Sequence, residues 1–301
     1  MRLAVNIGGF VARYGLEKSI ELCKNAGFDS MDFGLGLDPA NPLNVEETYV
    51  AEAERIKKLS LDMGLPVTQT HTPFHFKDAW KDPVAYEEYV MPAIKRSVAI
   101  SGLLGADVAV VHPLHHFLYK GHEEEIFEKN MEFYRSLIPI CKEYNVKVGI
   151  ENMFQGDPRR KQTTFDTCAT IPEFIRYVDT LDSEYMVACL DTGHIGLPVR
   201  DDECWDFIRA LGHDRLQSLH VHDNDYRGDK HQLPYLGTID WNEVTKALGE
   251  IDYQGDFTYE VRIGSVFSEF TDEEFVPIAT KYMADVGRHL CNMIDRNRPT
   301  K

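Results

Sequence analysis

One stretch of the chain, from Leu219 to Trp241, gathers many imidazole and carboxylate side chains. Its first residues alternate as in a β-strand, which puts His220 and His222 on one face and Val221 on the other. The polar residues that follow are Asp223, Asp225, Arg227, Asp229 and His231. Such donors at the C-terminal end of a strand are typical of a site for a divalent metal and an oxygen-rich substrate. The alternative for this stretch alone is a solvated acidic loop with two surface histidines.

Metal-capable side chains also end other apolar runs along the chain. They recur roughly every 30–40 residues, about the length of one strand and helix unit. The series is His71, His112, Glu151, Asp191, His220 and Glu260. Taken singly, each would be an ordinary core or surface group. Because the C-terminal ends of parallel barrel strands form one face, their regular placement predicts that they converge on a common site.

Four members of this series form the expected metal shell, namely Glu151, Asp191, His220 and Glu260. Three carboxylates and one imidazole suit Mn²⁺, Mg²⁺ or Zn²⁺, and they lack the thiolates of a structural zinc site. A cation would also offset the repulsion among the carboxylates. His222 is an alternative to His220 because the two share a strand face, and His220 is preferred because it lies deeper on the strand.

The elements that must position these residues are predicted to alternate between apolar strands and amphipathic helices. The expected strands are Leu3–Ile7, Phe28–Phe33, Pro66–Thr70, Val108–Val111, Val146–Ile150, Met186–Leu190, Leu216–Val221 and Phe257–Tyr259. The expected helices lie near Gly15–Ala26, Asn44–Gly64, Glu87–Leu104, Glu123–Tyr144, Pro172–Leu181, Cys204–Leu211, Trp241–Leu248 and Asp272–Ile294. Gly27 is expected to stop the first helix, and Asn44 with Glu47 to start the second as a capping box.

Eight continuously apolar strands, each followed by a helix, predict an α/β fold that is a single (β/α)₈ barrel. One domain spanning residues 1–301 is expected, since no linker or low-complexity segment interrupts the pattern. A doubly wound sheet is the alternative. The first strand is not followed by a Gly-rich phosphate loop, which counts against a dinucleotide-binding fold.

The charge and cysteine content narrow the classes of partner. The 301 residues carry a formal net charge of −17, a field that repels nucleic acid and anionic membranes but allows a small anionic substrate held by a local basic cluster. The six cysteines form no Cys-x-x-Cys pair, as expected for reduced thiols. No signal peptide and no membrane-spanning run is apparent, so a cytoplasmic location is expected. Homo-oligomerisation is left open.

Several segments carry a resemblance to a known family. They are V-G-I-E-N (148–152), C-L-D-T-G-H (189–194), L-H-V-H-D-N (219–224), D-K-H-Q-L-P (229–234) and T-Y-E-V (258–261), and L-E-K-S-I-E-L-C-K-N-A-G-F-D-S-M-D-F (16–33) adds an early match. The chain resembles the xylose-isomerase-like TIM-barrel superfamily, which includes sugar phosphate isomerases and epimerases, ketose 3-epimerases and endonuclease IV. The resemblance covers nearly the whole chain and is poorly specific for substrate.

The epimerase branch of that resemblance implies that Glu151, Asp191, His220 and Glu260 bind one divalent ion, Mn²⁺ before Zn²⁺ or Mg²⁺. Glu151 and Glu260 would flank a ketose or aldose, with His194 on a substrate oxygen and Arg227 at its far end. The chemistry also follows from the residue types. A metal stabilises the charge that develops at a carbonyl, while one carboxylate removes the adjacent proton and the other returns one.

The endonuclease IV branch implies a different activity, a phosphodiesterase with three zinc ions. Its nine ligand positions correspond to His71, His112, Glu151, Asp191, His194, His220, Asp229, His231 and Glu260. The acidic net charge counts against binding a phosphate backbone, and so do the bulky loops after His112 and Glu151. His71, His112, His194, Arg227, Asp229 and His231 are therefore expected to hold a second metal or to bind substrate. A sugar-conjugate lyase and a non-catalytic metal-binding barrel are the remaining alternatives.

Weaker candidates lie in the loops. The basic run Arg159-Arg160-Lys161 could hold a sugar phosphate, although a solvated loop is the simpler interpretation. Phe74, Phe76 and Trp80 could stack on a sugar ring or pack under a lid. His115 and His116 could extend the mouth of the barrel or be exposed, and the bulky run Pro234-Tyr235-Leu236-Gly237 could reshape the pocket floor.

Overall fold

The structure is a computed structural model that describes residues 1–74, 79–115, 118–268 and 270–299. Eight parallel strands run in the order β10-β1-β2-β3-β4-β5-β8-β9. Their bounds are β1 Leu3–Asn6, β2 Ser30–Gly34, β3 Val67–His71, β4 Val108–Val111, β5 Lys147–Glu151, β8 Met186–Asp191, β9 Leu216–His220 and β10 Phe257–Tyr259. Each candidate strand of the sequence is thus found, with small shifts at its ends.

The sheet closes into a barrel because β10 pairs with β1 on one side and with the end of β9 on the other. Leu3 on β1 pairs with Phe257 on β10, and a parallel bridge joins Val221, just after β9, to Tyr259 on β10. The Val221 amide donates to the Thr258 carbonyl at 2.8 Å, and the Glu260 amide donates to the Val221 carbonyl at 3.0 Å. This closure establishes a (β/α)₈ barrel and excludes the doubly wound alternative.

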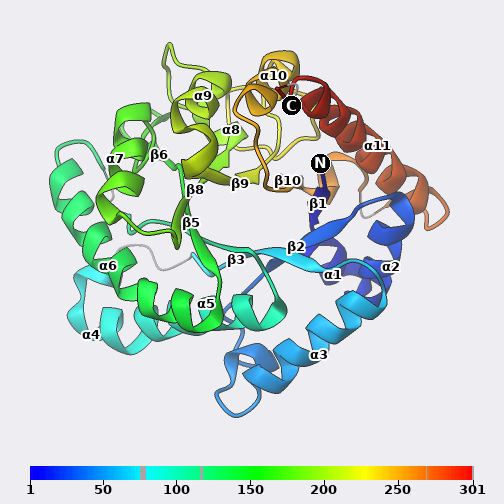
Figure 1. Cartoon of the computed structure of the whole chain (residues 1–301), viewed down its shortest axis with the longest axis horizontal. Coiled ribbons are helices and arrows are strands. Elements are labelled where there is room, and N and C mark those ends of the chain that lie inside the picture. Colours follow the sequence, from blue (N-terminus) through cyan, green and yellow to red (C-terminus); the bar gives the residue numbers. More distant parts are fainter. Residues whose placement is uncertain (75–78, 116–117, 269, 300–301) are drawn as a thin grey trace.

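The helices form an outer ring around the strands (Figure 1). The longer ones are α2 Leu16–Ala26, α3 Tyr49–Asp62, α5 Met91–Leu104, α6 Glu123–Tyr144, α7 Ile171–Leu181, α9 Cys204–Arg215, α10 Trp241–Glu250 and α11 Phe275–Arg296. Shorter helical turns are α1 Gly8–Tyr14, α4 Pro83–Ala85 and α8 Thr192–Ile195. Gly27 ends α2 in a left-handed conformation (φ 108°), as predicted.

The predicted helix start at Asn44 is wrong. Residues Pro42–Asn44 form a separate 3₁₀ turn, in which the Leu43 amide donates to the Asn41 side chain at 3.0 Å. The Asn44 side chain donates instead to the carbonyl of Asp38 at 2.8 Å. Helix α3 therefore begins only at Tyr49, because the residues that looked like a capping box serve a loop.

A further departure from the expected pattern follows β5. The polar segment expected as a loop is an antiparallel hairpin, made of β6 Phe154–Asp157 and β7 Gln162–Phe165.

All six cysteines, each within the described residues, are buried free thiols, in line with the reduced state expected. None of the helices among the described residues combines the length and the apolar character needed to cross a bilayer.

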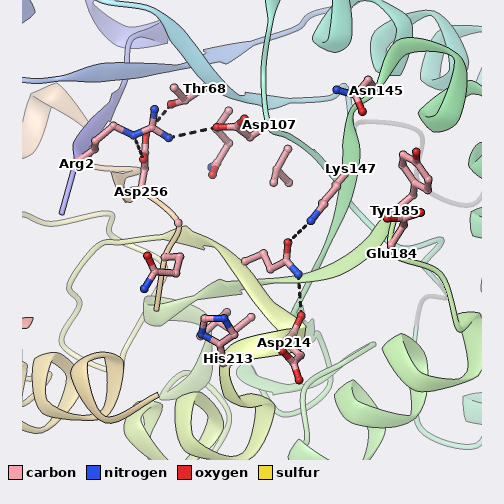
Figure 2. A pocket seen from close by; sticks show the side chains of 16 residues that line it. Arg2, Thr68, Asp107, Asn145, Lys147, Glu184, Tyr185, His213, Asp214 and Asp256 are labelled. Atoms are coloured by element: carbon pink, nitrogen blue, oxygen red, sulfur yellow. Dashed lines mark hydrogen bonds and ion pairs between the residues drawn. The ribbon is translucent and has the colours of Figure 1, made fainter. Parts of the chain in front are cut away.

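The N-terminal rim of the barrel is held by a buried carboxylate. Asp256 accepts hydrogen bonds from Thr68 Oγ1 at 2.8 Å and Arg2 Nε at 2.6 Å (Figure 2). It also accepts one from Ser30 Oγ at 2.6 Å. A polar cavity of about 690 Å³ lies at this rim, lined by Arg2, Asp107, Lys147 and Asp256 among others. These contacts tie β1, β2 and β3 to the start of β10. The metal-capable residues of the sequence lie at the opposite ends of the strands.

Candidate metal centre

The six donors predicted to converge do lie at the C-terminal ends of six different strands. His71, Glu151, Asp191 and His220 are the last residues of their strands, and His112 and Glu260 directly follow theirs. Glu151, Asp191 and His220 are almost fully buried, while the side chains of His112 and Glu260 keep 17% and 18% of their surface exposed. The barrel topology therefore brings these residues, remote in sequence, to one rim.

Glu151 is the centre of the first group of donors. Its Oε2 lies 2.8 Å from Nε2 of His112 and 3.7 Å from Nε2 of His71, and its Oε1 lies 3.0 Å from Nδ1 of His220. Burial works to raise the pKa of Glu151, but His220 and His112 hold it well below its usual range. Burial, with neighbouring His112, lowers the pKa of His71 to about 3, so this imidazole stays neutral and able to ligate.

The predicted four-residue shell is compact. Glu151, Asp191, His220 and Glu260 each offer one ligand atom, and these atoms all lie within 4.8 Å of one another. His220 Nδ1 also lies 3.7 Å from Oε2 of Glu260. Three carboxylates at this spacing repel one another unless protons or a cation intervene. The donor set and its spacing fit a divalent ion bound by oxygen and nitrogen.

Two more groups adjoin the quartet, which makes four overlapping groups with the one formed by His71, Glu151 and His220. One consists of Asp191, His194 and His222, and the other of His222, Asp229 and His231. His222 Nε2 lies 3.0 Å from Asp191 Oδ1 and 3.6 Å from Asp229 Oδ1. His231 Nε2 lies 2.8 Å from Asp229 Oδ2. His220 and His222, which the sequence presented as alternatives, therefore both belong to the centre, in different groups.

Backbone carbonyls orient three of the imidazoles. Nδ1 of His71 lies 2.8 Å from the Thr72 carbonyl, Nδ1 of His194 lies 2.8 Å from the Asn152 carbonyl, and Nδ1 of His231 lies 2.7 Å from the Glu260 carbonyl. A carbonyl can only accept, so each Nδ1 carries a proton and each Nε2 faces the carboxylates. This orientation is the one that metal-ligating histidines commonly have.

Two buried carboxylate oxygens that lack an aligned hydrogen bond also point to a metal site. Oε2 of Glu151 and Oδ1 of Asp229 are buried, and neither accepts an aligned hydrogen bond from the described residues. Buried carboxylate oxygens are costly to leave without a partner. A cation bound among these donor groups would supply a partner for both oxygens.

Local packing explains the glycine of C-L-D-T-G-H. A Cβ on Gly193 would lie 1.9 Å from Cε1 of His222, so only glycine allows this imidazole its place beside Asp191. Asp191 also caps the short helix α8, accepting from the His194 amide at 2.8 Å. The same short turn thus positions the Asp191 carboxylate and the His194 imidazole, and its glycine leaves room for the His222 imidazole.

Asp223, part of the donor-rich stretch, organises the loop and is in none of the four groups. Its Oδ2 accepts from Trp241 Nε1 at 2.9 Å and from the Tyr235 amide at 3.0 Å. Its Oδ1 accepts from the Asn224 amide at 2.9 Å and from the Ile239 amide at 3.2 Å. Asp223 therefore fixes the path of the loop that carries Asp229 and His231.

A cavity of about 410 Å³ opens above the donors. Its polar wall includes Glu151, His194, Asp229, His231 and Glu260, and its apolar wall includes Phe74, Met153 and Phe154. The Phe74 ring stacks on His112 with centroids 4.7 Å apart and planes at 28°. One polar and one apolar wall in a cavity of this size suit a small polar ligand with a C–H face.

Some predicted contacts are not found at this cavity. Arg227 is exposed and is not among the lining residues, whereas Arg262 is. Arg159 and Arg160 pair with Asp157 in the exposed turn of the β6–β7 hairpin. Trp80 donates from Nε1 to the His115 carbonyl at 2.8 Å, and His115 lines the cavity. Phe76 and His116 lie outside the described residues.

Sequence reasoning missed Asp32, a fully buried carboxylate on β2. Burial raises the pKa of Asp32 to about 6, although the charge of His220 and a hydrogen bond from Asn6 lower it. Its signal was a carboxylate inside a predicted core strand. Arg262 was missed as well, because nothing in its local sequence distinguishes it from other surface arginines.

Comparison with known proteins agrees with the barrel fold. A family model described as a xylose isomerase-like TIM barrel matches residues 20–282. D-psicose 3-epimerase from Enterocloster bolteae is 32% identical over 124 residues, which cover 40% of this chain and 35% of the epimerase.

Two solved structures share the fold over essentially the whole chain. A D-tagatose 3-epimerase-like protein superposes with a TM-score of 0.73 at 19% identity, covering 98% of this chain and 99% of the other. The IolI protein with a bound zinc atom superposes with a TM-score of 0.72 at 16% identity, covering 100% of both chains. The matched family model, which spans most of the sequence, shows that the chain belongs to the xylose isomerase-like TIM barrel family.

Proposed function

We propose that this protein is a divalent-metal-dependent isomerase or epimerase that acts on a sugar or sugar phosphate by proton transfer next to a carbonyl. The observation that carries the proposal is the compact quartet of Glu151, Asp191, His220 and Glu260 beneath a cavity of sugar size. The similarity to D-psicose 3-epimerase supports the substrate class. Mn²⁺ is the first expectation for the ion, with Zn²⁺ or Mg²⁺ as alternatives.

The four residues of the quartet would hold the ion, which when bound would supply Lewis-acid stabilisation of the charge developing on the substrate oxygen. Glu151 and Glu260 both line the cavity, so both can reach a bound sugar. Burial, reinforced by the charge of Glu151, raises the pKa of Glu260, which suits a group that must both accept and release a proton. One carboxylate takes the proton next to the carbonyl, and the other returns one.

The remaining cavity residues would position the substrate. His194 is held by the Asn152 carbonyl and presents Nε2 toward the carboxylates, where it can donate to a substrate oxygen. Phe74 offers an aromatic face to the C–H side of a sugar ring. Arg262 takes the role first expected of Arg227, since it lines the cavity and can reach a distal hydroxyl or phosphate.

The first test is solvent exchange of the substrate proton. Protein purified without added metal is analysed for bound ions, then incubated in D₂O with D-psicose, D-tagatose, D-fructose or L-ribulose. Glu151→Gln and Glu260→Gln should each remove a proton carrier, weaken metal binding and reduce exchange by at least about 10²-fold. NMR of the sugar measures the exchange.

The matched control is Glu173→Gln, a mostly buried glutamate that does not line the cavity. This variant should exchange at the wild-type rate. Exchange that persists in both Glu151→Gln and Glu260→Gln would show that the two-carboxylate mechanism is wrong. Loss of a leaving group from a substrate, in place of epimerisation, would indicate a lyase that begins with the same proton removal.

A second candidate function is supported by the four overlapping donor groups, which offer more ligands than one ion needs. This is a multi-zinc phosphodiesterase of the endonuclease IV kind. The net charge of −17 counts against it, because a phosphate backbone is bound by basic surfaces. Two or three equivalents of zinc together with nicking of abasic DNA would favour this function, and one equivalent of manganese without nicking would favour the epimerase.

A further inference from the structure

Asp32 is a buried carboxylate that none of the roles above uses. Its Oδ2 accepts a hydrogen bond from Nδ2 of Asn6 at 2.8 Å, while its Oδ1 accepts none from the described residues. Asp32 is in none of the four groups of converging ligand atoms found among the described residues. Leaving a carboxylate inside a barrel with half of its acceptors unused costs free energy, so a compensating partner or function is expected.

The group that faces Asp32 is the imidazole of His220. Nε2 of His220 lies 4.0 Å from Asp32 Oδ2 and makes no hydrogen bond with the described residues. The other edge of the ring faces the quartet, with Nδ1 3.0 Å from Glu151 Oε1 and 3.7 Å from Glu260 Oε2. The ring also stacks on His71, with centroids 5.2 Å apart and planes at 4°. His220 thus lies between the proposed metal ligands and Asp32.

His220 is oriented the opposite way from the other histidines of the centre. His71, His194 and His231 each turn Nδ1 to a backbone carbonyl and Nε2 to the carboxylates. His220 turns Nδ1 to the carboxylates, so the group that holds its second nitrogen must lie on the Nε2 side. Asp32 occupies that side, where a backbone carbonyl serves the other three.

We propose that Asp32 is a positioning residue that acts through His220, holding Nε2–H so that Nδ1 is presented to the metal. Once Nδ1 coordinates a cation, the neutral ring carries its proton on Nε2, and this buried donor requires an acceptor. A separation of 4.0 Å exceeds a direct hydrogen bond, but a small rotation of the carboxylate or one bridging water spans it. Asp32 thereby decides which nitrogen binds, without touching the ion.

The inference rests on the proposed metal site, and the experiment separates the two. Asp32→Asn keeps the shape of the side chain and removes its charge. The affinity for Zn²⁺, measured by competition with a chelating dye, should fall about 10–100-fold, as for other partners of ligating histidines. In the Zn²⁺-loaded wild-type protein, ¹⁵N NMR should show His220 bound through Nδ1, with the resonance identified by its loss in His220→Gln.

A double-variant comparison tests whether Asp32 acts through His220. In a His220→Gln background, Asp32→Asn should change Zn²⁺ affinity less than about twofold, because the coupled partner is gone. Asp256→Asn is the matched control, a buried aspartate at the other rim of the same barrel. It should lower stability and leave Zn²⁺ affinity within about twofold of wild type.

Three results would overturn the inference. They are wild-type Zn²⁺ affinity in Asp32→Asn, an undiminished effect of Asp32→Asn in the His220→Gln background, and coordination of His220 through Nε2 in the wild-type protein. The last result does not depend on Asp32→Asn, so it decides the matter even if that variant fails to fold. A wild-type protein that binds no divalent ion would overturn the proposed function together with this inference.

Discussion

At the scale of single residues, the candidate metal centre depends on Gly193, which leaves room for the His222 imidazole because it has no side chain. Gly193→Ala would place a methyl group 1.9 Å from Cε1 of His222, so the imidazole must move away from Asp191 and Asp229. We expect this variant to fold, because the clash is with a side chain at the rim, and to lose one or more equivalents of bound metal. Elemental analysis and a thermal unfolding curve measure the two effects.

Gly36→Ala is the control, since a methyl group there meets nothing within 4 Å. It should keep the wild-type metal content and midpoint of unfolding. If Gly193→Ala keeps the full metal content, His222 has no part in holding the ion.

At the scale of elements, the loop after β9 is as important as the strand. Asp223→Ala removes four acceptor contacts, leaving the Trp241 indole N–H and three backbone amides without this partner. The expected loss is about 2–4 kcal/mol of unfolding free energy, typical of a buried hydrogen-bonded carboxylate. Because the same loop carries Asp229 and His231, its metal affinity should fall as well. Denaturant unfolding and metal titration measure the two losses.

Asp225→Ala provides the comparison within the same loop. Asp225 makes a half-exposed ion pair with Lys230, and its removal should leave the unfolding free energy close to that of the wild type, because solvent screens such a pair. Equal destabilisation by Asp223→Ala and Asp225→Ala would contradict the role given to Asp223.

The strands were easier to predict from the sequence than the loops, for a physical reason. A buried parallel strand needs a continuous apolar run, and its C-terminal residue must face the mouth of a barrel, so Glu151 and Asp191 could be placed from local sequence alone. Loop contacts depend on residues far away. Asn44 was misread as a helix cap, and Asp223, one of the carboxylates of the donor-rich stretch, holds the loop, since the partners of both are fixed only in three dimensions.

At the scale of the whole molecule, basic residues do not balance the acidic ones, and the chain carries a net charge of −17. The carboxylates of Glu151, Asp191, Asp229 and Glu260 lie at one rim, and the protein compensates for them with histidines. Burial disfavours the charged form of His231, but its hydrogen bond to Asp229 and the neighbouring carboxylates raise its pKa to about 9. In the metal-free chain, protonated imidazoles thus supply the positive charge that a bound cation would otherwise supply.

Two consequences follow for the intact protein when metal is removed. A bound ion stabilises the folded state by about 2.7 kcal/mol at a free concentration 100 times its dissociation constant. Chelation should therefore lower the midpoint of thermal unfolding by about 5–10 °C, given about 2–4 °C for each kcal/mol in a chain of this size class. Metal bound by the quartet must also displace a proton from His220, whose pKa is lowered by burial but held well above its usual value by Glu260 and Glu151, so affinity should rise with pH and binding should release protons. Calorimetry in two buffers of different ionisation enthalpy measures that release. His220→Gln should respond less to chelation, and a wild-type midpoint that Mn²⁺, Zn²⁺ and Mg²⁺ all leave unchanged would contradict the proposed metal centre.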